Sequence, residues 1–318
     1  MGKIDYLRFL LVAVLNLLLL TSVCISQDTV ELRADQEKSF VEVWIEGKLF
    51  TSYRYGEEFA RKPVFYPVMA PNGVMVNREL PQVRPEVADD QDHPHHESLY
   101  FGYGDVDSYD FWSNRNGEKI LHRAVLKQES GDQGELELLL EWQEPEGKTM
   151  VSEIRRVVFG GSGDCLWMDH DMTLRAGNSS RLFMDTKEGM FAIRLADELK
   201  EKGGNGRYIN AYGWETAEHI WGKRSPWVAI RGEVQGEEVT IAIFDHPSTE
   251  NFPSYWHARD YGLFAINPFG RKDFVRGSSP LGKRLEAYKS FHFRHRLMVY
   301  SGKVSKERLD QDYWDYVK

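Results

Sequence analysis

Alternation of apolar and polar residues, repeated from about residue 38 to residue 300, constrains the fold of this chain more than any other feature. Val41, Val43 and Ile45 alternate with Glu42, Trp44 and Glu46, and Gly47-Lys48 then turns the chain back into Leu49 to Tyr55. Because successive side chains of a strand point to opposite faces, such runs predict strands with one buried face. The segment is therefore predicted to form a β-hairpin.

Eight further runs of the same kind follow, separated by turn signals such as Gly160-Gly161 and Gly203-Gly204. They are Leu136–Trp142, Met150–Phe159, Leu166–Leu174, Met190–Leu195, Trp227–Arg231, Val239–Phe244, Gly262–Ile266 and Ala287–Tyr300. Many strands without intervening helices predict an all-β protein, a large antiparallel β-sandwich. The tail from Ser305 to Tyr316 is the best helix candidate, so we expect a short C-terminal helix.

Residues 1–26 have the pattern of an export signal. Lys3 and Arg8 supply positive charge, and Phe9 to Leu20 is apolar except for Asn16. This stretch is too short to cross a bilayer comfortably, which takes roughly 20 apolar residues. We expect cleavage after Ser26 and a secreted or periplasmic protein with no membrane span after signal removal. An uncleaved signal that acts as an anchor, or a lipoprotein acylated at Cys24, is the alternative.

The remaining residues, 27–318, are expected to form a single β-sandwich domain, because no linker, repeat or change of composition divides them. The formal charge of the whole chain is −9, and removal of residues 1–26 makes it one unit more negative. An acidic chain of this kind argues against a nucleic-acid partner. After cleavage Cys165 would be the single cysteine, so no internal disulfide is expected.

The segment Asp92-His93-Pro94-His95-His96-Glu97 contains three of the ten histidines of the chain. Pro94 disfavours helical geometry at His93, so we expect an extended run with His93 and His95 on one face and His96 on the other. A second His-Pro pair occurs at His246-Pro247, and His257 follows it. We expect the two rigid His-Pro segments to converge on a polar pocket, the candidate active site.

An ordered series of strings resembles an exported bacterial family of unknown function that often carries the automated label "methane oxygenase PmoA". The strings are Tyr66–Val68, Asp92–His96, Gly104–Asp107, Asp110–Trp112, Asp185–Gly189, Trp221–Arg224, Phe244–Pro247 and Trp256–Gly262. A membrane methane monooxygenase subunit needs several long apolar segments, and residues 27–318 contain none. What the resemblance implies is a mutarotase-like supersandwich and a small-molecule carbohydrate ligand, since the family tends to be associated with sugar-catabolising oxidoreductases and isomerases.

Chemistry on a sugar hydroxyl or anomeric oxygen needs an acid and a base whose pKa values lie near the working pH. In mutarotase-like enzymes a histidine and a glutamate do this work. The resemblance therefore implies an epimerase, lyase or hydrolase in which the catalytic candidates are His93, His95, His96, Glu188, His246 and His257. Glu188 is the candidate base, and Lys187 would point to the opposite face if the segment is extended.

Substrate-binding candidates are residues that suit an oxidised sugar or a sugar ring. Arg259 and Lys223 suit a carboxylate or a keto oxygen, and tryptophans can stack on a ring. The candidates are Lys187, Trp221, Lys223, Trp256, Arg259 and Asp260, and Trp112 is an additional candidate platform.

Two alternatives stay open. No cofactor is certain, but a divalent metal could be held by His93, His95, His246 and His257, together with Glu188. No recognised zinc motif is present, so this spacing is suggestive only. The alternative from another class is a carbohydrate-binding protein that holds the same ligand without turning it over.

Overall fold

The structure is a computed structural model that describes residues 29–80 and 92–318. The predicted signal peptide, residues 1–26, lies outside these residues, and it stays a prediction. Within the described part of the chain, no helix is long and apolar enough to cross a membrane.

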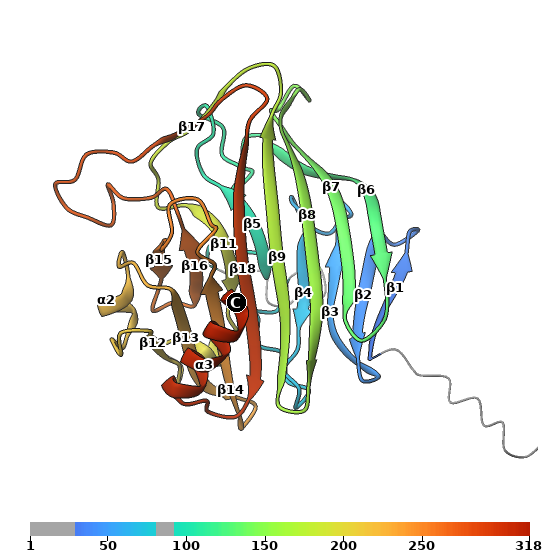
Figure 1. Ribbon diagram of the computed structural model, residues 1–318, viewed down its shortest axis with the longest axis vertical. Helices are drawn as coiled ribbons and strands as arrows, with labels where there is room; N and C mark the ends of the chain where they lie inside the picture. Colours follow the sequence, from blue (N-terminus) through green and yellow to red (C-terminus); the bar gives the residue numbers. More distant parts are fainter. Residues whose placement is uncertain (1–28, 81–91) are drawn as a thin grey trace, which may run out of the picture.

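Two antiparallel eight-stranded sheets form the described part of the molecule (Figure 1). The first sheet has, in spatial order, β1 (Val30–Asp35), β2 (Phe40–Ile45), β3 (Lys48–Arg54), β4 (Val64–Val68), β5 (Leu99–Tyr103), β11 (Gly189–Arg194), β16 (Leu263–Asn267) and β15 (Tyr255–Ala258). The second sheet has β12 (Arg207–Asn210), β13 (Trp227–Val234), β14 (Glu237–Asp245), β18 (Ser290–Ser301), β9 (Cys165–Ala176), β8 (Thr149–Ser162), β7 (Gly134–Gln143) and β6 (Lys119–Glu129). A small ribbon pairs β10 (Arg181–Phe183) with β17 (Lys283–Leu285).

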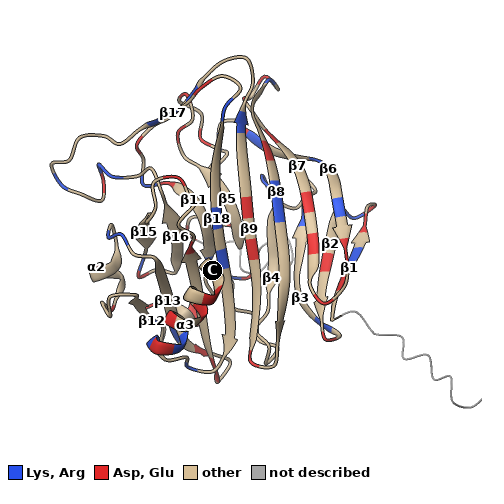
Figure 2. Cartoon of the chain, in the orientation of Figure 1, with Lys and Arg blue, Asp and Glu red and all other residues tan. Residues whose placement is uncertain are grey.

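The main hydrophobic core lies between the two sheets and takes residues from both. Strand β7 shows how the sequence forms this core, because Leu136, Leu138 and Leu140 are buried whereas the alternate residues Glu137, Leu139 and Glu141 are partly exposed. Charged residues recur along β6 to β9 (Figure 2), and the acidic residues of β7 and β9 occupy the partly exposed positions. This alternation confirms the predicted antiparallel β-sandwich.

Each sheet also carries a smaller cluster on its outer face. Helix α3 (Lys306–Val317) packs on the second sheet through Leu309, Tyr313 and Tyr316, which confirms the predicted C-terminal helix. The hydroxyl of Ser305 caps its first turn by accepting a hydrogen bond from the backbone N–H of Arg308, 3.2 Å away. On the first sheet, the outer cluster includes Tyr66, Tyr100 and Trp112.

The first predicted hairpin is confirmed, with its turn one residue earlier than expected. Residues Glu46 and Gly47 connect β2 to β3 and have φ angles of 49° and 74°. Two successive positive φ angles are typical of the type I′ turn that suits the twist of a hairpin. Two short helical segments, η2 (Asp197–Leu199) and α2 (Ala217–Ile220), lie in connections near β13 and β15.

Candidate functional site

The histidine-rich segment forms a turn on the outer side of the first sheet. His93 has a positive φ of 48°, and the backbone N–H of His96 donates to its carbonyl over 3.0 Å. The extended run predicted for this segment is therefore wrong. All three imidazoles gather, with ring centroids 5.9 Å apart for His93 and His95, 5.1 Å for His93 and His96, and 4.3 Å for His95 and His96.

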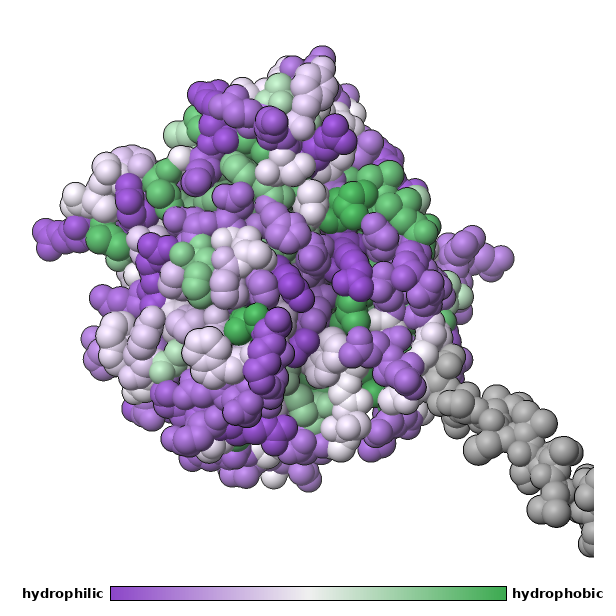
Figure 3. Space-filling view, viewed as in Figure 1, coloured by the Kyte–Doolittle hydropathy of each residue, from purple (hydrophilic) through white to green (hydrophobic). Residues whose placement is uncertain are grey.

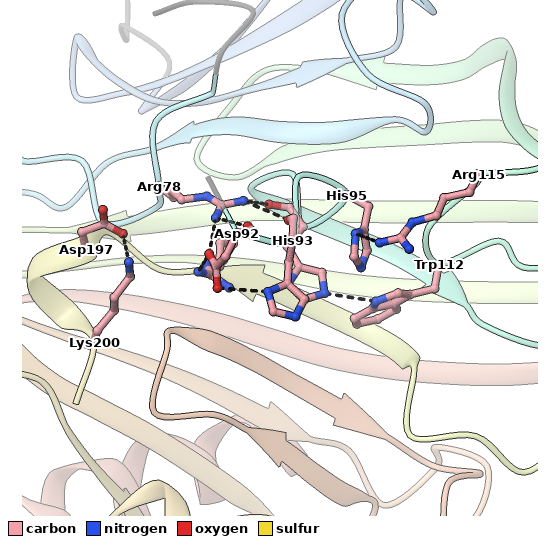
Figure 4. A network of polar contacts seen from close by, with 10 residues as sticks. Arg78, Asp92, His93, His95, Trp112, Arg115, Asp197 and Lys200 are labelled. Carbon is pink, nitrogen blue, oxygen red and sulfur yellow. Dashed lines mark hydrogen bonds and ion pairs between the residues drawn. The ribbon is translucent and has the colours of Figure 1, made fainter. Parts of the chain in front are cut away.

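Asp92 fixes the orientation of the His93 ring. Its Oδ2 accepts a hydrogen bond from Nδ1 of His93 at 3.0 Å, and its Oδ1 pairs with the guanidinium groups of Arg78 and Arg194 (Figure 4). Burial alone would raise the pKa of Asp92, but the hydrogen bond from His93 and the charge of Arg194 lower it. A carboxylate only accepts, so Nδ1 carries the proton and Nε2 of neutral His93 keeps its lone pair for a ligand.

His95 and His96 support this turn as neutral rings. Arg115 donates to Nδ1 of His95 at 3.0 Å, and the indole N–H of Trp112 donates to Nε2 of His96 at 3.3 Å. Burial and the charge of Lys62 lower the pKa of His95 to about 3. Burial, followed by the charge of His95, also lowers the pKa of His96. Both rings therefore stay neutral near pH 7 and act through hydrogen bonds and packing.

His257, from β15, joins the site through the segment before β11. Its Nδ1 donates to the backbone carbonyl of Lys187 at 2.9 Å, so Nε2 has the lone pair. Nε2 is buried and has no partner among the described residues. Burial, together with the charges of Arg259 and Lys187, lowers the pKa of His257 to about 3, although the hydrogen bond to the Lys187 carbonyl opposes this shift.

Glu188 follows in the same segment and forms an ion pair with Lys187, with Nζ and Oε1 2.7 Å apart. The two side chains therefore do not point to opposite faces, because residues 187 and 188 form a bend and not a strand. Burial raises the pKa of Tyr261, and the negative charge of Glu188 raises it further. The negative charge of Glu188 also contributes to the raised pKa of the buried Tyr100. Glu188 therefore lies close enough to both tyrosines for a charge interaction.

A glycine allows Glu188 to lie where it does. The backbone N–H of Gly104 donates to the Glu188 carbonyl at 2.7 Å, and a Cβ on Gly104 would lie 2.6 Å from the Glu188 Cβ. We expect Gly104→Ala to displace Glu188 and to cost about 1–3 kcal/mol of unfolding free energy. Urea unfolding measures the cost. Gly73→Ala is the control for backbone strain without a clash, because the φ of Gly73 is positive and no atom lies within 4 Å of a Cβ added there. A fully stable Gly104→Ala variant would contradict the packing described here.

A row of aromatic and cationic side chains, Tyr261, Arg259 and Trp221, extends from His93 to the edge of the first sheet. The ring of His93 lies parallel to Tyr261, with centroids 4.9 Å apart and 2° between the planes. The guanidinium of Arg259 lies 5.3 Å from the centroid of Tyr261 and 5.8 Å from that of Trp221. Trp221, Arg259 and Asp260 line a cavity of about 560 Å³, which is within the range of small-molecule sites.

The structure brings together most of the predicted site residues. These residues form a chain of contacts on the outer side of the first sheet. They are His93, His95, His96, Lys187, Glu188, Trp221, His257, Arg259 and Asp260. Their catalytic and binding roles stay predictions.

Four predicted residues are not placed for the roles expected of them. His246 contacts Tyr316 of α3, with ring centroids 5.3 Å apart, and Arg294 of β18, so it lies on the outer side of the second sheet. The two His-Pro segments therefore do not converge, because His93-Pro94 precedes β5 of the first sheet whereas His246-Pro247 follows β14 of the second. Trp256 is completely buried in the main core and Trp112 is 1% exposed, so neither can stack on a sugar ring. Lys223 is exposed and is not one of the cavity residues.

The residues do not fit the metal alternative. Among residues 29–80 and 92–318, no three histidine, cysteine, aspartate or glutamate side chains are placed to hold a metal ion. His246 is separated from the other four proposed ligands, as described above.

Sequence reasoning missed Arg78, Arg194, Tyr100 and Tyr261. The sequence does indicate Arg194, because it is the single charged residue in the otherwise apolar strand β11. The structure shows that it is completely buried there. A buried charge is expensive unless it is paired, so its presence predicts a partner such as Asp92. Tyr261 lies inside one of the strings of the family resemblance, but nothing in that string indicates which ring it would stack on.

The buried neutral His257 predicts acid sensitivity. Above about pH 6.5 the ring is neutral in the folded and unfolded chains, and below that pH the unfolded chain takes up a proton that the folded chain refuses down to about pH 3. Unfolding free energy should therefore fall by about 1.4 kcal/mol per pH unit between pH 6 and pH 4 on account of this residue. Urea unfolding of wild type and His257→Gln at several pH values measures it. Equal slopes for the two proteins would contradict the burial of a neutral ring.

Comparison with solved structures gives low identities. The galactosidase domain of an alpha-galactosidase-sucrose kinase, AgaSK, matches with a TM-score of 0.45 and 8% identity over 86% of this chain and 42% of that chain. A variant of a glycoside hydrolase family 97 enzyme from Pseudoalteromonas sp. strain K8 matches with a TM-score of 0.34 and 11% identity over 86% of this chain and 34% of that one. This chain thus spans less than half of either protein. A galactose mutarotase related enzyme from Lactobacillus acidophilus is covered completely, with a TM-score of 0.32 and 11% identity over 86% of this chain.

The comparison with curated proteins gives no match. The PmoA label does not appear in any of these findings, so that part of the resemblance stays a prediction. A family model described as "Family of unknown function (DUF6807)" matches residues 40–314, and this chain therefore belongs to that family.

Proposed function

We propose that the protein binds a carbohydrate on the outer side of the first sheet and acts on it by acid-base chemistry, with His93 and Glu188 as the proton-transferring groups. The observation that carries the proposal is the Asp92–His93 pair. It orients an imidazole that stacks on Tyr261, and the same tyrosine ring contacts Arg259, which lines the cavity. Aromatic faces and charged hydrogen-bonding groups are the surfaces that suit the apolar faces and hydroxyls of a sugar.

The division of roles follows from the environments of the groups. His93 is 44% exposed, and its ring is oriented by a carboxylate that itself is held by two arginines. Glu188, 31% exposed, supplies a carboxylate near Tyr261, the ring on which His93 stacks. His95 and His257, whose pKa values are lowered to about 3 by burial, are unsuited to proton transfer near pH 7 and position the ligand instead.

A carbohydrate-binding protein without turnover is the second candidate. The neutrality of His95, His96 and His257 favours it, since three of the four imidazoles at the site act only through hydrogen bonds at neutral pH.

We also propose that the protein works outside the cytoplasm, on the basis of the signal-like residues 1–26. The sugar ligand agrees with the resemblance to the PmoA-labelled exported family, which implies the same ligand class. A mutarotase-like reaction is one form of the proposed chemistry, next to lyase and hydrolase reactions.

Proton NMR in D₂O tests the proposal. The protein comprising residues 27–318 is incubated with aldoses, ketoses, their oxidised forms and simple glycosides. Acid-base chemistry is expected to show as faster exchange of anomers, as deuterium incorporation at a carbon next to a carbonyl, or as a new anomeric signal. Binding of a sugar without any of these changes would favour the binding protein, and no binding of any sugar would refute the proposal.

A further inference from the structure

Arg259, directly after β15, presents a cation that no group in residues 29–80 and 92–318 pairs with. Within the described part of the chain, its guanidinium makes no hydrogen bond or ion pair, although its backbone groups are bonded to Leu263 and Gly262. The rings of Trp221 and Tyr261 hold it by cation–π contacts at 5.8 Å and 5.3 Å. The group is thus held in place while its donors stay available.

Trp221 lines the same cavity and carries a second donor without a partner. Its Nε1 is buried and has no acceptor among the described residues, and both side chains line the cavity of about 560 Å³. Indole and guanidinium groups are donors only, so the group that satisfies them must be an acceptor. A buried donor without a partner is costly, which makes an acceptor on the ligand favourable.

We infer that the ligand of this site is an anionic sugar, whose carboxylate or equivalent oxyanion binds Arg259 and Trp221. This inference rests on the proposed function and narrows its ligand class. The planar guanidinium offers two parallel N–H donors to a carboxylate, and its prior fixation by two rings lowers the entropy lost on binding.

The acidic residues of the cavity select a sugar acid over a simple anion. Glu201 is occupied, since its two oxygens accept the backbone N–H groups of Tyr208 at 3.0 Å and Ala217 at 2.8 Å. Glu218 and Asp260 also line the cavity, and their carboxylates suit hydroxyl donors but repel a bare anion. A ligand with one oxyanion and several hydroxyls satisfies both sets of groups.

Isothermal titration calorimetry with matched ligands tests the inference. The ligands are glucuronate and galacturonate against glucose and galactose, with glucose 6-sulfate to separate a carboxylate from another oxyanion. We expect uronates to bind roughly 10- to 100-fold more tightly than the neutral sugars, because hydrogen bonds to charged groups are strong. Arg259→Gln should abolish this preference, and Trp221→Phe, which keeps a ring but removes the N–H, should reduce it.

Arg33→Gln is the matched control. Arg33 also lies over a tryptophan, 4.4 Å from the ring of Trp44, but on β1 at the opposite edge of the sheet. Arg33→Gln should leave the preference for uronates over neutral sugars unchanged. Tighter binding of the sulfate alone would still support an anionic sugar and assign the oxyanion to a sulfate ester.

Equal affinity for neutral and acidic sugars, or a preference that survives Arg259→Gln, would overturn the inference while the proposed function stands. Failure of every sugar to bind would overturn the proposed function and the inference together.

Discussion

Replacing His93 with asparagine is expected to lower turnover by about 10²- to 10⁴-fold, the contribution of a positioned acid-base group. The reason is the loss of the Nε2 lone pair that Asp92 orients. The fold should persist, because His93 is 44% exposed and asparagine tolerates its positive φ of 48° better than most residues. Turnover is measured with the sugar that the NMR survey identifies.

Three measurements make this test specific. His292→Asn removes a partly exposed imidazole from the outer face of the second sheet, where it bonds to Thr173, and should leave turnover unchanged. Sugar affinity of His93→Asn should change much less than turnover, which separates chemistry from binding. Thermal unfolding should show that the variant is folded. Full turnover in His93→Asn would remove His93 from the mechanism.

Replacing Glu153 with glutamine is expected to cost about 3–5 kcal/mol of unfolding free energy, the largest stability effect that we expect of a single substitution. Glu153 lies in the core between the sheets, where it accepts hydrogen bonds from Arg155 at 2.6 Å and from the indole of Trp142 at 2.7 Å. Both charged side chains are at most 1% exposed. Glutamine leaves the Arg155 charge buried without a counter-charge, and urea unfolding measures the loss.

The double variant Glu153→Leu with Arg155→Met is the control. It removes both charges and fills the space with apolar groups of similar size, so it should recover most of the lost stability. Arg156→Gln, next in sequence, removes an arginine that is 48% exposed and paired with Glu135, and it should cost at most about 1 kcal/mol. A Glu153→Gln variant as stable as wild type would contradict the buried pair.

The sandwich was predictable mainly from strands with one side facing water, although β1 and β6 were not recognised. Strands β7 and β9 alternate between buried and partly exposed residues along most of their length, and their buried positions are mainly apolar. Strand β5 was not recognised, because the outer cluster covers its second face and Leu99 to Tyr103 are all buried. A strand that is buried on both sides has no period of two.

The candidate site was predictable in its residue types and only partly in its geometry. The cluster around His93 stood out by composition, but the turn that gathers its rings depends on Asp92 and on Arg194, which is distant in sequence. The separation of His246 from His257 depends on which sheet each strand joins. Such long-range pairing is not encoded in local spacing.

The most direct measurement is a crystal structure of the protein comprising residues 27–318 with a bound sugar. The account predicts a sugar ring in the cavity lined by Trp221 and Arg259, with an oxygen within hydrogen-bonding distance of Nε2 of His93. A sugar bound on the outer face of the second sheet, beside His246 and α3, would contradict it.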